Sequence, residues 1–350
     1  MNFAPSGKPV PVVQPGEFPF AAAFLDHGHI YGQCNGLREA GGELRYVYDP
    51  DPARVAQFCK TYPGVKPVDS FERLLDDPEI KLIAAAAVPC ERGPIGCRVL
   101  QAGKDYFTDK TPFTTLDQLA QARELVAATG RKYMVYFSER LHVECAVYAG
   151  QLVQQGAIGK VVQVTGFGPH RHGTGRPDWF YNKAQYGGIL CDIGSHQFEQ
   201  FLFFSGATDA EVLSSTIANK AHPDHPEFED FGEVHLLGNN GATNFIRVDW
   251  LTPDASRTWG DGRTFILGTE GYIELRKYVE VGRGEDGDQL YLVNNKVEEH
   301  YSLAGKVGFP FFGELILDVL NRTEKAMTQE HAFKAAELCL RAEQQARWIA

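Results

Sequence analysis

The chain has 350 residues, which suggests two domains at about 150 residues per domain. Its 34 Lys and Arg residues against 45 Asp and Glu residues give a net charge of −11, which argues against nucleic acid as a partner, because a phosphate backbone needs clustered cations. No apolar run reaches the roughly 20 residues that span a bilayer, and the N-terminus lacks a signal-peptide pattern. Seven scattered cysteines without a CxxC pair are typical of reduced thiols, so we expect a cytoplasmic protein without a membrane partner.

The N-terminal part of the chain predicts alternating strands and helices after an irregular lead-in over residues 1–18. We expect strands at 18–25, 44–49, 81–89, 104–110 and 132–137, and helices at 33–41, 53–63, 93–104 and 116–130. Such alternation implies right-handed βαβ units and a parallel sheet, and the uninterrupted apolar strands fit a sheet that is covered on both faces.

The pattern changes after about residue 143. A helix is expected at 143–156, strands at 160–170, 210–219, 233–239, 242–251, 263–269, 271–282 and 289–295, and helices over 310–348. The sequence therefore predicts a parallel α/β domain over 1–143, followed by an α+β domain over 144–350 with a large, mostly antiparallel sheet. In such a pair the active site is expected in the cleft between the domains.

The turn after the first strand resembles a dinucleotide-binding fingerprint. The window 26–32 reads DHGHIYG, in which Gly28 is in register with the central glycine of GxGxxG and a helix follows. Asp49 lies 21 residues after Gly28, where a carboxylate binds ribose hydroxyls and repels a 2′-phosphate, so NAD is favoured over NADP. From these residues alone, a phosphate-free βαβ unit with a solvated Asp-Pro turn remains an alternative. Asp26, beside the expected pyrophosphate, could instead be a helix N-cap that points away.

Three further segments carry a family resemblance. They read TDKTP at 108–112, GGILCDIGSH at 187–196, and HAFKAAELCLRAEQQA at 331–346. Together they resemble the Gfo/Idh/MocA family, which includes glucose–fructose oxidoreductase and inositol dehydrogenase, from about residue 18 to residue 348. The departures from the family pattern are Asp26 for the first glycine, Cys90 for an asparagine, and Gly93 for a histidine.

The resemblance implies a Rossmann NAD-binding domain followed by a substrate-binding domain with an open sheet, through which the family commonly forms dimers or tetramers. It places Lys110, Asp192 and His196 at the catalytic positions. The cofactor contacts expected on this basis are His27, Gly28, His29, Ile30, Tyr31, Asp49, Ala87, Val88, Pro89, Asp109 and Lys110.

Hydride transfer from an alcohol carbon to nicotinamide needs a proton acceptor and a donor to the alcohol oxygen. An imidazole suits the first task, so His196 is the expected base, and Lys110 can donate to the same oxygen. If a helix begins near residue 191, Asp192 lies one turn from His196 and could orient a substrate hydroxyl. From spacing alone, a solvated Asp/His pair is the alternative.

Two segments offer polar groups and aromatic faces of the kind that carbohydrate sites combine. One follows the last predicted Rossmann strand, and the other is the loop 169–181, whose alternative interpretation is an ordinary exposed loop. The substrate-binding candidates are Glu139, Arg140, His142, His170, Arg171, Arg176, Trp179 and Tyr181. No metal site is expected, because no third ligand accompanies the paired histidines.

The sequence thus favours an NAD-dependent oxidoreductase that acts on a hydroxyl carbon of a sugar, sugar derivative or cyclitol. One alternative is an enzyme that retains NAD and cleaves glycosides through transient oxidation. A second is a non-catalytic NAD(H)-binding scaffold. Net NADH formation would separate the first from the other two.

Overall fold

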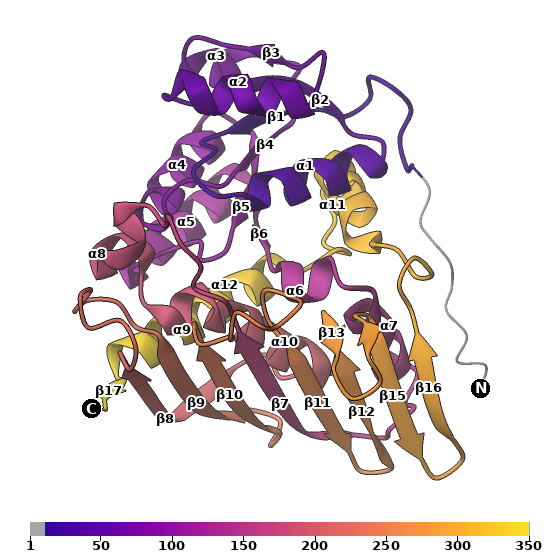
Figure 1. Cartoon of the computed structure of the whole chain (residues 1–350). Helices are drawn as coiled ribbons and strands as arrows, with labels where there is room; N and C mark the ends of the chain where they lie inside the picture. The colour runs from indigo at the N-terminus through magenta and orange to yellow at the C-terminus, as the bar shows by residue number, and fades with distance from the viewer. Residues whose placement is uncertain (1–10, 350) are drawn as a thin grey trace. The chain divides into compact units, whose positions relative to one another are not determined.

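The structure, a computed structural model, describes residues 11–349, so the first ten residues of the predicted lead-in lie outside the described residues. The described chain folds into two compact units (Figure 1). The N-terminal unit contains residues 11–136 and Pro310–Phe333, and the C-terminal unit contains Phe137–Phe309 and residues 334–349. This division differs from a single boundary at residue 143, because a late segment returns to the first unit.

The N-terminal unit is built on a six-stranded sheet that is parallel, as predicted, and that contains one short strand, residues 66–67, beyond the five predicted. In spatial order its strands are β3 (Lys66–Pro67), β2 (Glu43–Tyr48), β1 (Pro19–Ala23), β4 (Leu82–Ala85), β5 (Asp105–Asp109) and β6 (Tyr133–Tyr136). This is the doubly wound order in which the strand sequence reverses between β1 and β4. The crevice at that reversal, outside the carboxyl ends of the strands, is where such sheets bind ligands.

Two of the helices of this unit begin at a residue whose side chain caps them. The unit's helices are α1 (His29–Glu39), α2 (Pro52–Thr61), α3 (Phe71–Asp76), α4 (Pro89–Gln101), α5 (Leu116–Thr129) and α11 (Pro310–Asn321). The Asp51 carboxylate caps α2 by accepting from the N–H of Ala53 at 2.8 Å. Helix α11 packs closely on α1, since a Cβ added to Gly36 would lie 2.3 Å from the Phe312 ring. The α11 segment, predicted as part of the C-terminal domain, therefore completes the N-terminal unit.

The C-terminal unit contains a nine-stranded sheet. In spatial order its strands are β16 (Glu298–Ser302), β15 (Gln289–Asn294), β12 (Gly271–Arg276), β11 (Arg263–Gly268), β7 (Val161–Pro169), β10 (Thr243–Asp249), β9 (Phe231–Gly238), β8 (Ala210–Ala218) and β17 (Arg347–Trp348). The sheet is mostly antiparallel, as predicted, with parallel pairs at β7/β10 and β8/β17. A separate hairpin pairs β13 (Val279–Glu280) with β14 (Glu285–Asp286). The prediction of helix to residue 348 was wrong at its end, where β17 extends the sheet.

The C-terminal unit also contains helical segments, some of which pack on this large sheet. They are α6 (Ser138–Leu141), α7 (Glu144–Gln154), the 3₁₀ helix η1 (Asp178–Tyr181), α8 (Lys183–Tyr186), α9 (Ile189–Asp192), α10 (Gly194–Ser205) and α12 (Gln329–Gln344), which begins at the end of the N-terminal unit's range. Helix α10 packs on β7 and β10, and α7 packs on β12 (Figure 1). Alternate residues of β9 are buried and exposed, as expected for strands with one covered face. Within residues 11–349, no helix has the length and apolar character needed to cross a membrane.

The glycine pair of the GGILCDIGSH segment is required by backbone conformation. Gly187 and Gly188 have φ of 89° and 92°, a region that residues with a Cβ rarely adopt. A Cβ on Gly188 would also lie 2.3 Å from the carboxyl carbon of Glu343. The pair therefore brings the chain close to α12, which carries Glu343.

Glu343 belongs to a cluster of two buried carboxyl groups and one partly exposed ammonium. The Lys183 Nζ lies 2.8 Å from Glu343 Oε1 and also contacts Glu229, whose other oxygen accepts from the N–H of Ile189 at 2.8 Å. Burial and the neighbouring charge of Glu229 raise the pKa of Glu343 to about 8, despite the opposing effect of Lys183. With Glu343 protonated, the cluster is electrically neutral.

The raised pKa predicts a pH-dependent stability. Between about 4.5, the ordinary value, and 8, the folded chain holds one proton more than the unfolded chain, so the free energy of unfolding falls as pH rises. We expect that Glu343→Gln abolishes this fall in the free energy of unfolding, which in the wild type is on the order of a few kcal/mol between pH 4.5 and pH 8. When thermal unfolding of both proteins is measured from pH 5 to pH 8, the unfolding midpoint of the variant should rise relative to that of the wild type as pH rises. Glu337→Gln, on the same helix, is the control, and a pH-independent difference for Glu343→Gln would contradict the prediction.

Candidate functional site

The fingerprint turn connects β1 to α1 as the sequence predicts. Gly28 is the N-cap of α1 and has no side-chain cap, and the N–H of His27 donates to the Ala86 carbonyl at 3.0 Å. A Cβ added to Gly28 would meet nothing within 4 Å. The N-terminus of this 11-residue helix thus faces open space. Its free backbone N–H groups and the helix dipole favour an anion there.

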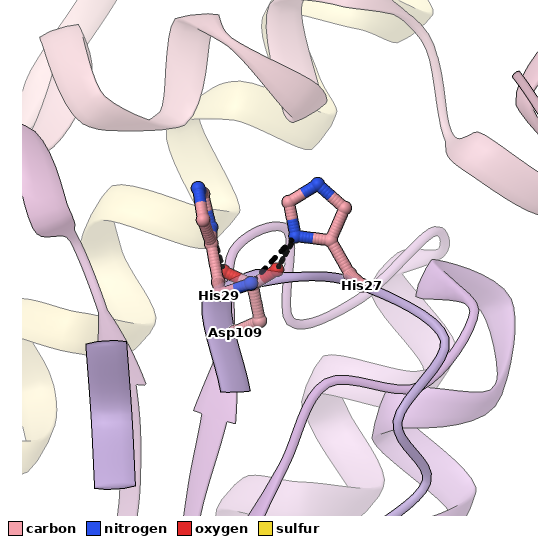
Figure 2. Close-up of side chains that lie close together, drawn as sticks. All are labelled: His27, His29 and Asp109. Atoms are coloured by element: carbon pink, nitrogen blue, oxygen red, sulfur yellow. Dashed lines mark hydrogen bonds and ion pairs between the residues drawn. The ribbon is translucent and has the colours of Figure 1, made fainter. Parts of the chain in front are cut away.

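The Asp109 carboxylate, at the end of β5, lies beside this turn and is fully buried. Its Oδ1 lies 2.8 Å from His29 Nδ1, and its Oδ2 lies 3.0 Å from His27 Nδ1 (Figure 2). The two imidazole rings are partly exposed and lie edge to face with centroids 4.3 Å apart. Two predicted cofactor residues, His27 and His29, therefore converge on the carboxylate of a third.

The environment of this group favours an ionised Asp109 and a neutral His27. Burial alone would raise the pKa of Asp109, but the charges of His29, Arg92 and His27 hold it well below its ordinary value. Burial and the neighbouring His29 lower the pKa of His27 to about 4, although Asp109 opposes the shift. Lys110 also lowers the pKa of His27, which places its ammonium within electrostatic reach of the turn.

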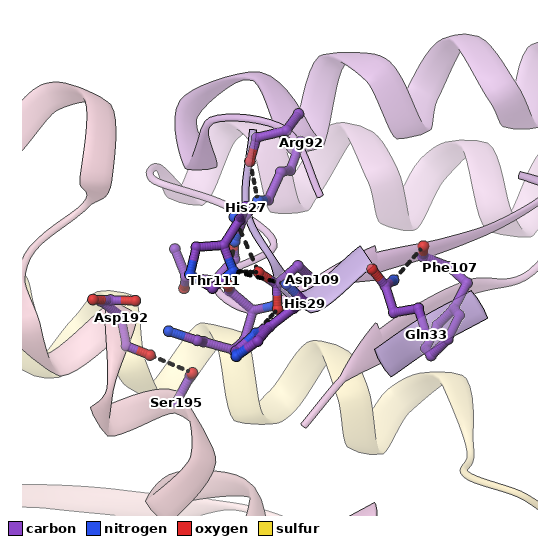
Figure 3. Close-up of polar contacts among 11 residues, drawn as sticks. His27, His29, Gln33, Arg92, Phe107, Asp109, Thr111, Asp192 and Ser195 are labelled. Atoms are coloured by element: carbon purple, nitrogen blue, oxygen red, sulfur yellow. Dashed lines mark hydrogen bonds and ion pairs between the residues drawn. The ribbon is translucent and has the colours of Figure 1, made fainter. Parts of the chain in front are cut away.

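Arg92, which no sequence pattern singled out, holds the backbone on both sides of the Lys110–Thr111 peptide. Its side chain is 1% exposed, and Nε donates to the Ala87 carbonyl at 2.6 Å. The other guanidinium nitrogens contact Asp109 Oδ2 at 3.3 Å, the Thr111 carbonyl at 3.2 Å and the Lys110 carbonyl (Figure 3). The Lys110–Thr111 peptide is cis, and Lys110 is 6% exposed.

Asp49, predicted to bind ribose hydroxyls, is held by backbone donors. Its Oδ2 accepts from the N–H of Leu25 at 2.6 Å, and its Oδ1 accepts from the N–H of Asp51 at 2.8 Å. Asp26 forms an ion pair with Arg54 at 2.5 Å, and Arg54 also lies 3.6 Å from Asp49. Burial and the charge of Asp49 raise the pKa of Asp26, with Arg54 opposing. Asp26 does not cap α1, whose N-cap is Gly28.

The remaining predicted cofactor residues have mainly packing roles in the described structure. Ile30 is buried, and Tyr31 stacks on Tyr62 with ring centroids 6.0 Å apart. Val88 and Pro89 form the start of α4, as its N-cap and first residue. These positions line the same carboxyl edge of the sheet as Gly28 and Lys110.

In the C-terminal unit, Asp192 and His196 lie on consecutive helices rather than on one. Helix α9 ends at Asp192 and α10 begins at Gly194, but Ile193 keeps helical φ and ψ of −74° and −40°. The Ser195 hydroxyl donates to the Asp192 carbonyl at 2.9 Å (Figure 3). Asp192 and His196 are 8% and 2% exposed. The spacing of about one turn is thus preserved across the break.

Glu139, a predicted substrate contact, is paired with a lysine that sequence reasoning missed. Lys277 Nζ lies 3.0 Å from Glu139 Oε2, and Gln197 Nε2 donates to the same oxygen at 2.8 Å. Burial opposes ionisation of Glu139, but Lys277, His196 and His170 outweigh it and lower its pKa to about 2. The Glu139 carboxylate is therefore ionised and within electrostatic reach of His196.

The loop after β7 brings four of its predicted residues against aromatic rings. His170 lies between Trp250 and Trp259, with ring centroids 5.2 and 4.4 Å away. The Arg176 guanidinium lies over the Phe180 and Trp250 rings. Burial lowers the pKa of Arg176, and Asp192 opposes this, so the two side chains interact electrostatically. The Trp179 ring packs edge to face on Phe180.

Tyr181 belongs to a cluster with His172, a residue of the same loop, and with two histidines of a second loop. Its hydroxyl lies 3.0 Å from His172 Nε2, and its ring stacks on His225 at 3.6 Å. The His172 ring lies 4.4 Å from His222, whose Nδ1 is 2.9 Å from the buried Asp230 carboxylate. The aromatic composition of the loop hinted at this cluster, but the second loop that completes it carried no motif.

Three predicted substrate residues are engaged in internal contacts. Arg140 forms a buried ion pair with Glu199, with Nε 2.7 Å from Oε1, and lies over the Phe203 ring. Arg171 Nη2 donates to four carbonyls in the segment 253–258. The His142 ring packs on Phe309 at 4.2 Å, and burial lowers its pKa to about 4.

Comparison with known proteins agrees with this architecture. The family model described as an oxidoreductase family with an NAD-binding Rossmann fold matches residues 20–137, and the GFO/IDH/MocA C-terminal domain model matches residues 147–274. Scyllo-inositol 2-dehydrogenase (NAD(+)) of Bacillus subtilis (strain 168) is 25% identical over 238 residues, which cover 67% of this chain and 66% of that relative. The match therefore spans slightly less than two thirds of the relative's length.

Solved structures extend the likeness to nearly the whole chain. An oxidoreductase structure from Erwinia carotovora atroseptica SCRI1043 is 54% identical, with a TM-score of 0.92, and covers 95% of this chain and 100% of that one. Aldose-aldose oxidoreductase from Caulobacter crescentus has a TM-score of 0.76 at 19% identity, with 95% and 98% covered.

Two further chains share the fold and differ in cofactor. A levoglucosan dehydrogenase complexed with NADH has a TM-score of 0.76 at 14% identity, with 94% of this chain and 98% of that chain covered. A 3-ketoreductase from Actinomadura kijaniata complexed with NADP has a TM-score of 0.75 at 16% identity, with 96% and 99% covered. By its two matching family models and its 54% identical structural relative, the chain belongs to the GFO/IDH/MocA family of oxidoreductases.

Proposed function

We propose that this protein transfers a hydride between a hydroxyl-bearing carbon of a sugar, sugar derivative or cyclitol and a nicotinamide dinucleotide. The observation that carries the proposal is the position of Lys110, buried at the carboxyl end of β5 beside the Gly28 turn. The open space in front of Gly28 and the uncapped start of α1 fit a dinucleotide diphosphate. The sugar and inositol dehydrogenases among the relatives support the substrate class.

In this proposal the bound nicotinamide supplies the hydride chemistry, and the protein handles the proton and the alcohol oxygen. The Lys110 ammonium donates to the substrate oxygen and stabilises the developing alkoxide. His196 accepts the hydroxyl proton, and the Glu139 carboxylate stabilises the positive charge that His196 then carries. Asp192 and Arg176 orient further hydroxyl groups.

A spectrophotometric panel tests the function. The protein is incubated with NAD⁺ or NADP⁺ and with inositols, aldoses and anhydro sugars, and absorbance at the wavelength of reduced nicotinamide is followed. We expect net NADH formation with at least one cyclic polyol or sugar, and its loss in Lys110→Ala. Wild-type rates in Lys110→Ala, or no turnover across the panel despite measurable NADH binding, would contradict the proposal.

We further propose that NAD is preferred over NADP. Asp26, Asp49 and Asp51 surround the single guanidinium of Arg54, with ion-pair distances of 2.5, 3.6 and 3.7 Å. The local charge is therefore negative, which disfavours a 2′-phosphate. The free lone pairs of the Asp49 oxygens remain available to ribose hydroxyls.

The variant Asp49→Asn tests this preference. The amide keeps an oxygen acceptor for one backbone N–H but removes the charge, so the ratio of kcat/KM for NAD⁺ to that for NADP⁺ should fall by about 10-fold. Steady-state kinetics with both dinucleotides give the ratio. Asp77→Asn, on the same unit but after α3, is a matched control. An unchanged ratio in Asp49→Asn would remove Asp49 from cofactor selection.

A further inference from the structure

His27, His29 and Asp109, expected above as cofactor contacts, take no part in the proton transfers of the proposed reaction, and the fold brings Asp109 beside the paired histidines as a third ligand that the sequence did not predict. Each offers one ligand atom, and the three atoms lie within 4.8 Å of one another (Figure 2). Among the residues that the structure describes, this is the one set of three or more His, Cys, Asp or Glu side chains arranged so that they could hold a metal ion. The cluster joins two segments that are 80 residues apart in sequence.

We propose that His27, His29 and Asp109 bind a divalent transition-metal ion of the zinc class at the fingerprint turn. Two imidazoles and one carboxylate are a donor set that suits Zn²⁺, Co²⁺, Ni²⁺ or Fe²⁺ rather than Mg²⁺ or Ca²⁺, which prefer oxygen ligands. The site does not depend on the proposed hydride transfer.

The geometry of the three atoms fits a shared ion. The Nδ1 atoms of His29 and His27 lie 2.8 and 3.0 Å from the two oxygens of Asp109. With metal–ligand bonds of about 2.1 Å, each of these nitrogen–oxygen separations corresponds to an angle of about 90° at the ion. The three ligand atoms lie within 4.8 Å of one another, and the remaining positions of the ion stay open to water or to an oxygen anion.

The site is anchored on one side and accessible on the other. The Asp109 side chain is 0% exposed, whereas His27 and His29 are 26% and 33% exposed, so an ion can enter from solvent. Asp109 is oriented by the N–H of Lys110 at 2.8 Å and by Arg92 at 3.3 Å. Such outer contacts hold a metal ligand in place, while the nearby cations weaken the binding of the ion.

Direct metal binding tests the proposal. Chelator-treated full-length protein is dialysed against Zn²⁺ at micromolar concentration and analysed for metal, and Co²⁺ is added in parallel to record its visible absorption. We expect one equivalent of tightly bound Zn²⁺ and Co²⁺ bands of a site with nitrogen and oxygen ligands. His27→Gln, His29→Gln and Asp109→Asn should each weaken Zn²⁺ binding by at least about 10-fold.

Two control variants locate the ion. His235→Gln removes an exposed imidazole on β9, and His222→Gln removes one from the other histidine cluster. Both should bind Zn²⁺ as the wild type does. Absence of stoichiometric Zn²⁺ in the wild type would overturn the proposal, as would loss of binding in His222→Gln with binding kept in His29→Gln. Circular dichroism of each variant confirms folding, and His29→Gln, on a partly exposed side chain, is the variant least prone to unfold.

Discussion

The variant His196→Asn is expected to lower kcat by about 10²–10⁴-fold, the usual contribution of a positioned general base. Asparagine is a poor proton acceptor but retains polarity in a side chain that is 2% exposed beside Phe137. Because the proposed role concerns the reacting proton, NADH affinity should remain within about 3-fold of wild type. Turnover and NADH fluorescence titration, measured on the same preparation, give the two quantities.

Two further measurements make this result interpretable. His235→Asn removes an exposed imidazole from β9 of the same unit and should leave kcat unchanged. The thermal unfolding midpoint of His196→Asn reports whether the unit is intact. Turnover within about 5-fold of wild type in an intact His196→Asn protein would exclude His196 as the base and make Tyr181, whose hydroxyl lies 3.0 Å from His172 Nε2, the next candidate.

Lys277→Met is expected to have the largest effect on stability. It leaves the Glu139 carboxylate, 2% exposed, without its ammonium partner, and breaking a buried pair from one side costs about 3–5 kcal/mol. The loss should appear as a lower free energy of unfolding in urea. Glu139 should at the same time become easier to protonate, because Lys277 is the strongest influence that lowers its pKa.

The double variant Lys277→Met/Glu139→Gln distinguishes charge from packing. Removing both charges eliminates the unpaired carboxylate, so the double variant should recover most of the lost stability. A free energy of unfolding for Lys277→Met within about 1 kcal/mol of the wild-type value would show that the ion pair contributes little to stability. A double variant that is no more stable than Lys277→Met would show that the loss does not come from the unpaired charge.

Much of the N-terminal unit could be predicted from local patterns. Continuous apolar runs became β1 and β4, and the amphipathic segment after Thr115 became α5, with the Thr115 hydroxyl accepting from the N–H of Gln118 at 3.2 Å. The open sheet of the C-terminal unit followed from alternating residues, as in β9. The hydrophobic pattern of each strand, and the pattern and cap of the helix, are contained within a short stretch of sequence. No distant contact is therefore needed to specify these elements.

The site was less predictable because its partners are distant in sequence. Lys277 lies 138 residues from Glu139, and a lysine at a strand end resembles any surface lysine until the sheet forms. Arg92 lies in a helix whose sequence carries no functional motif, yet its guanidinium contacts both the Ala87 carbonyl and the Asp109 carboxylate. Conversely, Arg140 and Arg171 are residues of the type that binds ligands, but their side chains contact the protein itself. Arg140 pairs with Glu199, and Arg171 lies against backbone carbonyls.

The return of residues 310–333 to the N-terminal unit has a consequence for synthesis on the ribosome. Phe311 and Phe312 pack against Phe107, and Arg322 binds Asp105 through two contacts of 2.6 and 2.8 Å. A nascent chain that has only reached Tyr136 contains all six strands of its first sheet but leaves this apolar face uncovered. The first unit to be translated can therefore be completed only after 173 intervening residues, Phe137–Phe309, have emerged, and during that interval its exposed face is a target for chaperones.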